Sequence, residues 1–440
     1  MSVITVREYS AFCVKGKGGS SPQGYYALKE SAFLLLERFL LENAAEGEDG
    51  ATDVMGLSVR RGVGKVITVK NYVGVIALND GTVIEILPKI SGAEDGSDTE
   101  TARRLLVRML NTLYRISHKS LQEAELAVCR MNVLEVFIRL FTDEVTRLTK
   151  MGLQSGYEAR EDNLTCAKGK LLFAKQLQHN LAHKERIYAM YDEFTVNRPE
   201  NRILKAALVY LSSLTRSART QKDLKRLLAL FEGVTPSVNY DADFARIAPD
   251  RNTKAYETAL RWAQVFLKKK SFTSFAGSSA AMALLFPMEK LFESYIPALM
   301  RELLTGTGAT LSTQDKGYHL FDTPACFALC PDIVLAHQGE VFIMDTKWKR
   351  LSGDAALYGI SQADTYQMYA YYQKYNAAQA VKSVTLLYPK PQEDIKPLTL
   401  EDAVTGARVN IRFIDMREER KSLAELLKEY GLLPAVDSMS

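Results

Sequence analysis

Two apolar segments in the C-terminal third of the chain constrain the fold most strongly. Asp332–Ala336 and Glu340–Trp348 flank the turn-forming triplet His337-Gln338-Gly339. Apolar runs of this length around a short polar turn predict a β-hairpin whose strands are buried. A helix is predicted next, at Ser361–Tyr375, and then a strand at Ser383–Tyr388. This alternation of strands and helices indicates a mixed α/β sheet.

The first hundred residues predict a small β-rich module. Leu57–Ile90 is rich in Val and Ile, and Asn79-Asp80-Gly81 supplies hairpin-turn residues between two alternating runs. Acidic stretches of small residues, Glu42–Asp53 and Ser91–Glu100, border this segment and predict loops.

The middle of the chain has a helical period. Apolar residues recur three and four positions apart in residues 102–116 and 132–153, and further helices are predicted at Asn201–Leu214 and Asp223–Phe231. A chain of 440 residues exceeds what one core usually organises. We therefore expect an α/β multidomain protein with a β-rich N-terminal module (1–100), a mainly helical middle region (101–275) and a C-terminal mixed-sheet domain (276–440).

Composition narrows the class of protein but not its ligand. The net charge of +4, from 56 basic and 52 acidic residues, says little about nucleic acid, which needs a local basic surface. The five cysteines are scattered, and Cys326 and Cys330 lack the neighbours of a zinc site, so reduced thiols are expected. The N-terminus has no signal-peptide pattern and no apolar stretch reaches about 20 residues, so we expect a cytoplasmic protein without a membrane span.

The predicted hairpin brings together side chains that could cut a phosphodiester. Asp345 and Lys347 share one face of their strand, and the hairpin places Asp332 beside them. Carboxylates can hold Mg²⁺, which neutralises phosphate and activates water, while a lysine can orient that water. A charge at the end of a buried strand also costs several kcal/mol unless it is partnered. The alternative interpretation is a salt bridge at a sheet edge.

The helix before the hairpin could add a third carboxylate. Within the predicted helix Pro287–Leu304, Glu289 and Glu293 lie four residues apart on one face. We choose Glu293 as the additional metal-directed acid. An ordinary exposed glutamate remains the alternative, as does Glu289 in the same role.

The helix after the hairpin is dense in phenol and amide groups, which could contact a DNA backbone. An aromatic stripe at helical spacing can equally be core packing. The side chains concerned are Gln362, Tyr366, Gln367, Tyr369 and Tyr371.

At these residues the sequence resembles the PD-(D/E)xK nuclease superfamily and, within it, the McrC family, the nuclease subunits of McrBC modification-dependent restriction systems. The resemblance rests on FESYI, PDIVL, IMDTKWK and ADTYQMYAYY, and it extends to NYVGVIALNDGTVIEILPKI and YDEFTVNRPENRILKAAL upstream. Residues 1–42 and the acidic loop after them match no motif of the family.

The resemblance implies a restriction-endonuclease-like domain in the last third of the chain. It implies that Asp332, Asp345 and Lys347 form the catalytic core, with Glu293 as the upstream acid and Gln367 as a supporting residue. Mg²⁺ would then be held by Asp332, Asp345 and Glu293.

The resemblance also implies a partner and a substrate: an McrB-like AAA+ GTPase hexamer, and double-stranded DNA with modified cytosine. The sequence agrees that nucleotide hydrolysis belongs to a partner, because its nearest approach to a P-loop, residues 61–66, lacks the glycine spacing and the Ser/Thr. We expect the N-terminal module to dock this GTPase near Arg60, Arg61 and Lys65, with a solvated basic loop as the alternative. A non-catalytic activator of the GTPase and a DNA-repair nuclease are the alternative functions.

Overall fold

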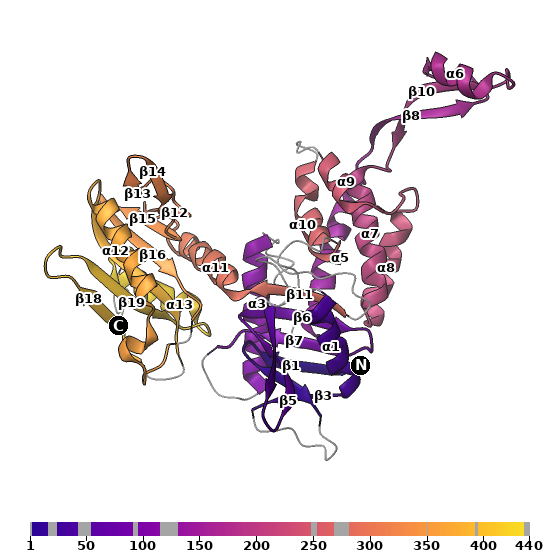
Figure 1. The fold of residues 1–440 in the computed structure, drawn as a ribbon. Coiled ribbons are helices and arrows are strands. Elements are labelled where there is room, and N and C mark those ends of the chain that lie inside the picture. The colour runs from indigo at the N-terminus through magenta and orange to yellow at the C-terminus, as the bar shows by residue number, and fades with distance from the viewer. Residues whose placement is uncertain are drawn as a thin grey trace, which may run out of the picture. The chain divides into compact units, whose positions relative to one another are not determined.

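The computed structural model describes residues 2–15, 24–42, 54–90, 96–114, 131–247, 253–267, 281–349, 351–391 and 395–434 (Figure 1). The chain forms two compact units, one made of residues 1–133 and 277–440 and the other of Leu134–Ala276. The second unit is thus an insertion in the sequence of the first. The predicted division into 1–100, 101–275 and 276–440 is a different partition, and it stays a prediction.

Among its described residues, the N-terminal part of the first unit contains two four-stranded sheets and the helices α1 (Glu30–Glu42) and α3 (Gly96–Tyr114). One sheet has the order β1 (Val3–Arg7), β7 (Val83–Leu87), β6 (Tyr72–Leu78) and β11 (Ala281–Pro287). The other has the order β3 (Tyr26–Leu28), β2 (Ala11–Val14), β5 (Gly64–Val69) and β4 (Met55–Arg60).

The predicted β-rich module is confirmed. β6 and β7 pair antiparallel around the predicted turn, where Gly81 has a φ of 85° that favours glycine. The second predicted acidic loop is shorter than expected, because α3 begins at Gly96. The first predicted loop, from residue 43 to 53, and residues 91–95 of the second lie outside the described residues.

Strand β11 completes the N-terminal sheet from the far side of the insertion, and the sequence did not predict it. It pairs antiparallel with β6 over seven residues, from Ala281 opposite Leu78 to Pro287 opposite Tyr72. Gly74 permits this pairing, because a Cβ at this position would lie 2.0 Å from the carbonyl oxygen of Leu284.

The C-terminal part of the first unit is built on a six-stranded mixed sheet, as predicted. Its order is β12 (Thr310–Thr313), β15 (Ile333–His337), β16 (Glu340–Thr346), β17 (Ala380–Pro389), β19 (Arg408–Ile414) and β18 (Leu398–Glu401). β16, β17 and β19 run parallel, and the other pairs are antiparallel. A separate hairpin joins β13 (His319–Asp322) to β14 (Ala325–Ala328).

Helices cover both faces of this sheet. On one face, α12 (Gln362–Asn376) packs Tyr371 and Tyr375 against Ile343 and other core residues. Phe342 points to the other face, where its ring stacks on Tyr430 at 5.6 Å. The helices that contact the strands besides α12 are α11 (Met288–Leu303) and α13 (Glu419–Glu429), and a short 3-10 turn spans Ala356–Gly359.

The second unit is mainly helical. Its helices are α5, which begins at the unit boundary (Val133–Lys150), α7 (Pro199–Leu214), α8 (Ala218–Leu230), α9 (Tyr240–Arg246) and α10 (Glu257–Leu267), with a 3-10 turn at Thr253–Tyr256.

The prediction of a mainly helical middle region missed a β-arm. The long strands β8 (Gly156–Leu164) and β10 (Ile187–Thr195) pair antiparallel, and β9 (Lys170–Leu171) and α6 (Phe173–Asn180) lie at the far end of the arm (Figure 1). Its strands alternate weakly and expose large apolar side chains, Tyr157 and Phe194 among them. Hydrophobic periodicity therefore gave no strand signal.

Two expectations from composition can be compared with the described residues. No helix among them combines the length and hydropathy that a membrane span requires. The four cysteines they include, Cys13, Cys166, Cys326 and Cys330, are free thiols. Cys129 lies outside the described residues.

We predict that Gly74→Ala destabilises the first unit by about 2 kcal/mol or more, because its φ of 137° and the nearby Leu284 carbonyl both exclude a side chain. Thermal unfolding of the full chain measures the loss. Gly56→Ala in β4 is the matched control, since a Cβ there meets nothing within 4 Å. Equal melting temperatures for the two variants would contradict the argument.

Candidate active site at the end of the six-stranded sheet

The hairpin register brings the two predicted aspartates together. Ile333 pairs with Met344, so one further step places Asp332 opposite Asp345. Asp345 ends an apolar strand and is only 1% exposed. The extended chain continues beyond it, because the backbone N–H of Lys347 donates to the carbonyl of Leu387 on β17 at 2.9 Å.

Lys347 lies beside Asp345, as the strand period predicted. The ammonium nitrogen is 2.5 Å from Asp345 Oδ2. It also lies 3.4 Å from Oε1 of Gln367, and the amide of Gln367 in turn donates to the Tyr371 hydroxyl at 2.7 Å. Helix α12 therefore holds Gln367 in contact with the proposed catalytic lysine.

Asp332 is fixed by two residues that the sequence did not single out. Thr346 donates to Asp332 Oδ2 from its backbone nitrogen at 2.8 Å and from its hydroxyl at 2.7 Å. The side-chain amide of Gln314 lies 3.2 Å from Oδ1. Thr346 stands between two predicted residues, whereas Gln314 follows a four-residue strand whose pattern is too short to detect.

Glu293 joins the site through Gln314, whose amide donates to Glu293 as well as to Asp332. Glu289 instead accepts a hydrogen bond from Asn71 at 3.2 Å. The geometry therefore favours Glu293 over Glu289 as the upstream acid, a choice that the sequence left open.

The carboxyl groups of the site hold their protons more tightly than in water. Burial raises the pKa of Asp345 to about 6, and repulsion from Asp332 adds to this effect. Burial, then repulsion from Asp332 and Asp345, raises the pKa of Glu293 to about 7. Burial also raises the pKa of Asp332, against the hydrogen bonds from Thr346.

The pKa of Lys347 is raised as well, although burial acts on it in the opposite direction. Burial is the largest single effect on the pKa of Lys347 and lowers it, but the charge and hydrogen bond of Asp345 together with the charges of Asp364 and Asp332 raise it above its ordinary value. Lys347 therefore stays protonated beside the carboxylates and can donate a proton or hydrogen bonds.

The donor set fits a hard divalent cation. When all are ionised, the three carboxylates and one ammonium leave two negative charges in a largely buried place, which a cation would offset. Within the described part of the chain, no three His, Cys, Asp or Glu side chains form a ready metal cluster. Mg²⁺ does not require one, because it binds through one or two carboxylates and keeps several waters.

The tyrosine-rich helix divides between the two roles that the sequence left open. Tyr366 and Tyr369 are exposed, and Gln362 donates to the Tyr366 hydroxyl at 2.5 Å. Tyr371 is buried in the sheet core and therefore takes the core-packing role. Tyr366, Tyr369 and Gln362 remain candidate DNA contacts.

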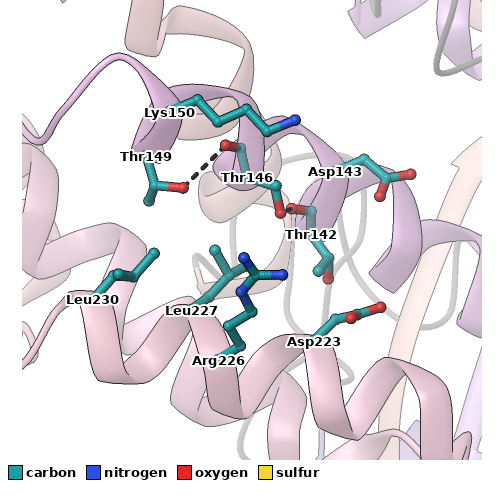
Figure 2. A pocket seen from close by; sticks show the side chains of 9 residues that line it. All are labelled: Thr142, Asp143, Thr146, Thr149, Lys150, Asp223, Arg226, Leu227 and Leu230. Carbon is teal, nitrogen blue, oxygen red and sulfur yellow. Dashed lines mark hydrogen bonds between the residues drawn. The ribbon is translucent and has the colours of Figure 1, made fainter.

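Cavities in the described part of the chain also lie outside the carboxylate cluster. One of about 320 Å³ belongs to the second unit, where Asp143 and Lys150 on α5 face Asp223 and Arg226 on α8 across it (Figure 2). Another, of about 440 Å³, adjoins the ends of β17 and β19, and Lys390, Lys396 and Lys421 are among the residues that line it. Because β16 runs parallel to β17, this second cavity lies at the same end of the sheet as Asp345.

Comparison with known proteins gives one family and a similar fold. The model of a family described as "McrBC 5-methylcytosine restriction system component" matches residues 67–389. No curated protein matches the sequence.

The protein is similar to a chain in a solved structure, a half-complex refined from a tetradecameric assembly of Thermococcus gammatolerans McrB AAA+ hexamers with bound McrC. The TM-score is 0.67 at 18% identity, covering 98% of this chain and 100% of the other. A second match, in the cryo-EM structure of the Thermococcus gammatolerans McrBC complex, has a TM-score of 0.49 at 21% identity and covers 69% and 88% of the two chains. The first likeness supports the mixed α/β fold over the whole chain.

We predict that Asp345→Asn stabilises the metal-free protein more at pH 8 than at pH 5. Unfolded aspartate titrates near pKa ~3.9, whereas Asp345 titrates at a pKa of about 6 in the fold. Between these values the folded state binds more protons, so the unfolding free energy of the wild type falls as pH rises. The variant lacks this loss, and its advantage should grow by roughly 2–6 °C in Tm.

Calorimetry in EDTA across this pH range measures the difference between the two proteins. Glu293→Gln should also raise Tm more at high pH than at low pH, and the change should be centred at a higher pH because the pKa of Glu293 is about 7. A difference in Tm that stays constant with pH would contradict the burial of an ionised Asp345.

Proposed function

The chain belongs to the family of McrBC 5-methylcytosine restriction system components, and from this premise we propose that it is a Mg²⁺-dependent endonuclease that cuts double-stranded DNA containing modified cytosine. The observation that carries the proposal is the convergence of Asp332, Asp345 and Lys347 at one end of the six-stranded sheet. We propose that these residues form a PD-(D/E)xK, restriction-endonuclease-like site.

Each residue has a role that follows from its contacts. Asp332 and Asp345 would hold Mg²⁺, with Glu293 as a further acid on the side of Gln314. A bound Mg²⁺ supplies charge neutralisation at the phosphate and a water of lowered pKa. Lys347 holds a proton and can donate to the attacking water or to the phosphate oxygens, and Gln367 accepts from Lys347 and limits where its ammonium group can lie.

DNA would approach along the end of the sheet. The cavity beside β17 and β19 lies at the same end as Asp345. Three lysines and three acids line it, namely Lys390, Lys396, Lys421, Asp415, Glu418 and Glu425, and Lys390 and Lys421 pair with Asp415 and Glu418. Phosphate contacts from lysine position a protein on DNA without reading sequence. Recognition of the modified base would then belong to a partner.

That partner is proposed to be an McrB-like AAA+ GTPase hexamer, which this chain stimulates. The similar solved chain comes from an assembly of McrB AAA+ hexamers with bound McrC. Two surfaces are candidates for the contact. The predicted one, around the β4–β5 hairpin, exposes Arg60 and Arg61, although Lys65 is paired with Glu37 at 2.6 Å.

The second surface is on the β-arm. Phe173, Leu177 and Leu181 follow one another at four-residue spacing on α6 and its end, and all three are exposed. An exposed apolar stripe of this kind is typical of a protein contact rather than of a solvated helix. We propose that this stripe, and the Tyr157–Phe194 ring pair on the arm, bind the GTPase.

We predict that Asp345→Ala or Lys347→Ala lowers the rate of Mg²⁺-dependent cleavage at least about 100-fold, because each removes a group that acts on the reacting phosphate. Folding and GTPase binding should survive. Cleavage of methylated duplex DNA with GTP and the partner, read on gels, measures the rate.

The control is Lys382→Ala. Lys382 pairs with Glu340 at 2.8 Å, an exposed acid–lysine pair at the opposite end of β16 and β17. This variant should cut like the wild type. Undiminished cutting by Asp345→Ala would remove the site assignment, and GTPase stimulation without any cutting by the wild type would favour a non-catalytic activator.

We predict that Phe173→Ser combined with Leu177→Ser reduces stimulation of the partner's GTP hydrolysis at least about tenfold, because an apolar contact is lost. The control is Val238→Ser, an exposed apolar residue in the same unit but outside the arm. A loss of stimulation in Arg60→Ala with Arg61→Ala, and none in the arm variant, would assign docking to the β4–β5 hairpin instead.

A further inference from the structure

A buried contact joins the N-terminal strands to the proposed nuclease edge. Trp348, directly after Lys347, donates from its indole Nε1 to both carboxylate oxygens of Glu8, at 2.9 and 3.1 Å. Glu8 is 2% exposed and Trp348 is 4% exposed. The two residues are 340 positions apart in sequence but lie in the same compact unit.

The backbone of the N-terminal sheet holds Glu8 in place. The Glu8 nitrogen donates to the carbonyl of Leu87 at 3.1 Å, and the Glu8 carboxylate accepts from the nitrogen of Lys89 at 2.9 Å. Tyr9, the next residue, has a φ of 62°, which is costly for a bulky side chain and persists only where neighbours fix the turn. The carboxylate is therefore presented to Trp348 from a rigid support.

Trp348 is connected to two site residues from different elements. It follows Lys347 in the chain, and its ring packs edge-to-face against Phe292 with centroids 5.2 Å apart. Phe292 in turn precedes Glu293 on α11. A shift of the indole would therefore displace the segments that carry both Lys347 and Glu293.

We propose that Glu8 is a positioning residue for the nuclease edge, holding Trp348 so that Lys347 and Glu293 keep their places around the aspartates. The inference rests on the proposed function and adds to it a residue that directly follows the first strand of the chain. The expected effect on the cleavage rate follows from geometry, because a catalytic group that is misplaced by about 1 Å can lower the rate about 100-fold.

The test is a double-mutant cycle in the full-length chain with Glu8→Gln, Trp348→Phe and the pair together. The Glu8→Gln change keeps the size of the side chain but removes its charge and replaces one of the two acceptor oxygens that Trp348 contacts by an amide donor, and Trp348→Phe keeps an aromatic ring but removes the indole donor. We expect each single variant to lower the single-turnover cleavage rate about 10- to 100-fold at an unchanged half-saturating DNA concentration. The double variant should match the slower single variant, because both changes break the same contact.

The matched control is Glu135→Gln in the second unit. Glu135 is also a buried carboxylate, and it accepts from the Thr215 hydroxyl at 2.7 Å and from the Arg216 nitrogen at 2.8 Å. This variant should lose a similar amount of thermal stability without a comparable loss of cleavage rate. Additive effects in the cycle, rates within about twofold of wild type, or an equal rate loss in Glu135→Gln would overturn the proposal.

A second readout does not depend on cleavage. The chain has two tryptophans, so Trp262→Phe leaves Trp348 as the only indole. In this background, Glu8→Gln should raise the acrylamide quenching constant of Trp348 at least about twofold. It should also reduce the rise in Tm that added Mn²⁺, used as a probe in place of Mg²⁺, produces. If the wild type cuts no DNA, the proposed function fails, whereas unchanged quenching and an unchanged Mn²⁺ response in Glu8→Gln would count against the positioning role itself.

Discussion

The burial of one carboxylate, Asp345, is the constraint on which the C-terminal part of the protein depends. A carboxylate removed from water is costly unless charged or hydrogen-bonding partners surround it. Lys347 provides the charge, and the neighbouring Asp332 adds repulsion that the ordinary needs of folding do not explain. The strands, the helices and the hydrogen bonds of Gln314 hold Asp332, Asp345 and Glu293 close together, although their mutual repulsion destabilises the fold. An arrangement of charged groups that lowers the stability of the fold is typical of functional sites.

The central sheet and the convergence of Asp332, Asp345 and Lys347 could be predicted because their signals are local. The turn after Asp332–Ala336, the apolar strand before Asp345 and the two-residue period together determine which side chains meet. Gln314 and Glu8 could not be predicted in the same way. Gln314 contacts Asp332, and Glu8 contacts Trp348 beside the site, each from a distant segment through a tertiary contact that has no periodic sequence pattern. The β-arm escaped prediction because its strands expose apolar side chains instead of alternating.

The compact units do not follow the order of segments in the chain. Val133 and Gly277 border an insertion, so the β-rich N-terminal strands and the mixed sheet belong to one unit although Leu134–Ala276 separates their halves in sequence. Contacts between polar side chains hold these halves together, including Arg108 with Glu419 and Glu8 with Trp348. Removing either half would leave such charges without partners, so the C-terminal part is not expected to fold alone.

The pairing of β6 with β11 also bears on how the protein is made. β6 ends at Leu78 and its partner begins at Ala281, so about 200 residues must leave the ribosome before this edge of the sheet is covered. At roughly 5–20 residues per second, the wait lasts about 10 to 40 s. An uncovered strand edge invites pairing with other chains. Nascent copies on one messenger therefore need either a chaperone or spacing between ribosomes during this interval.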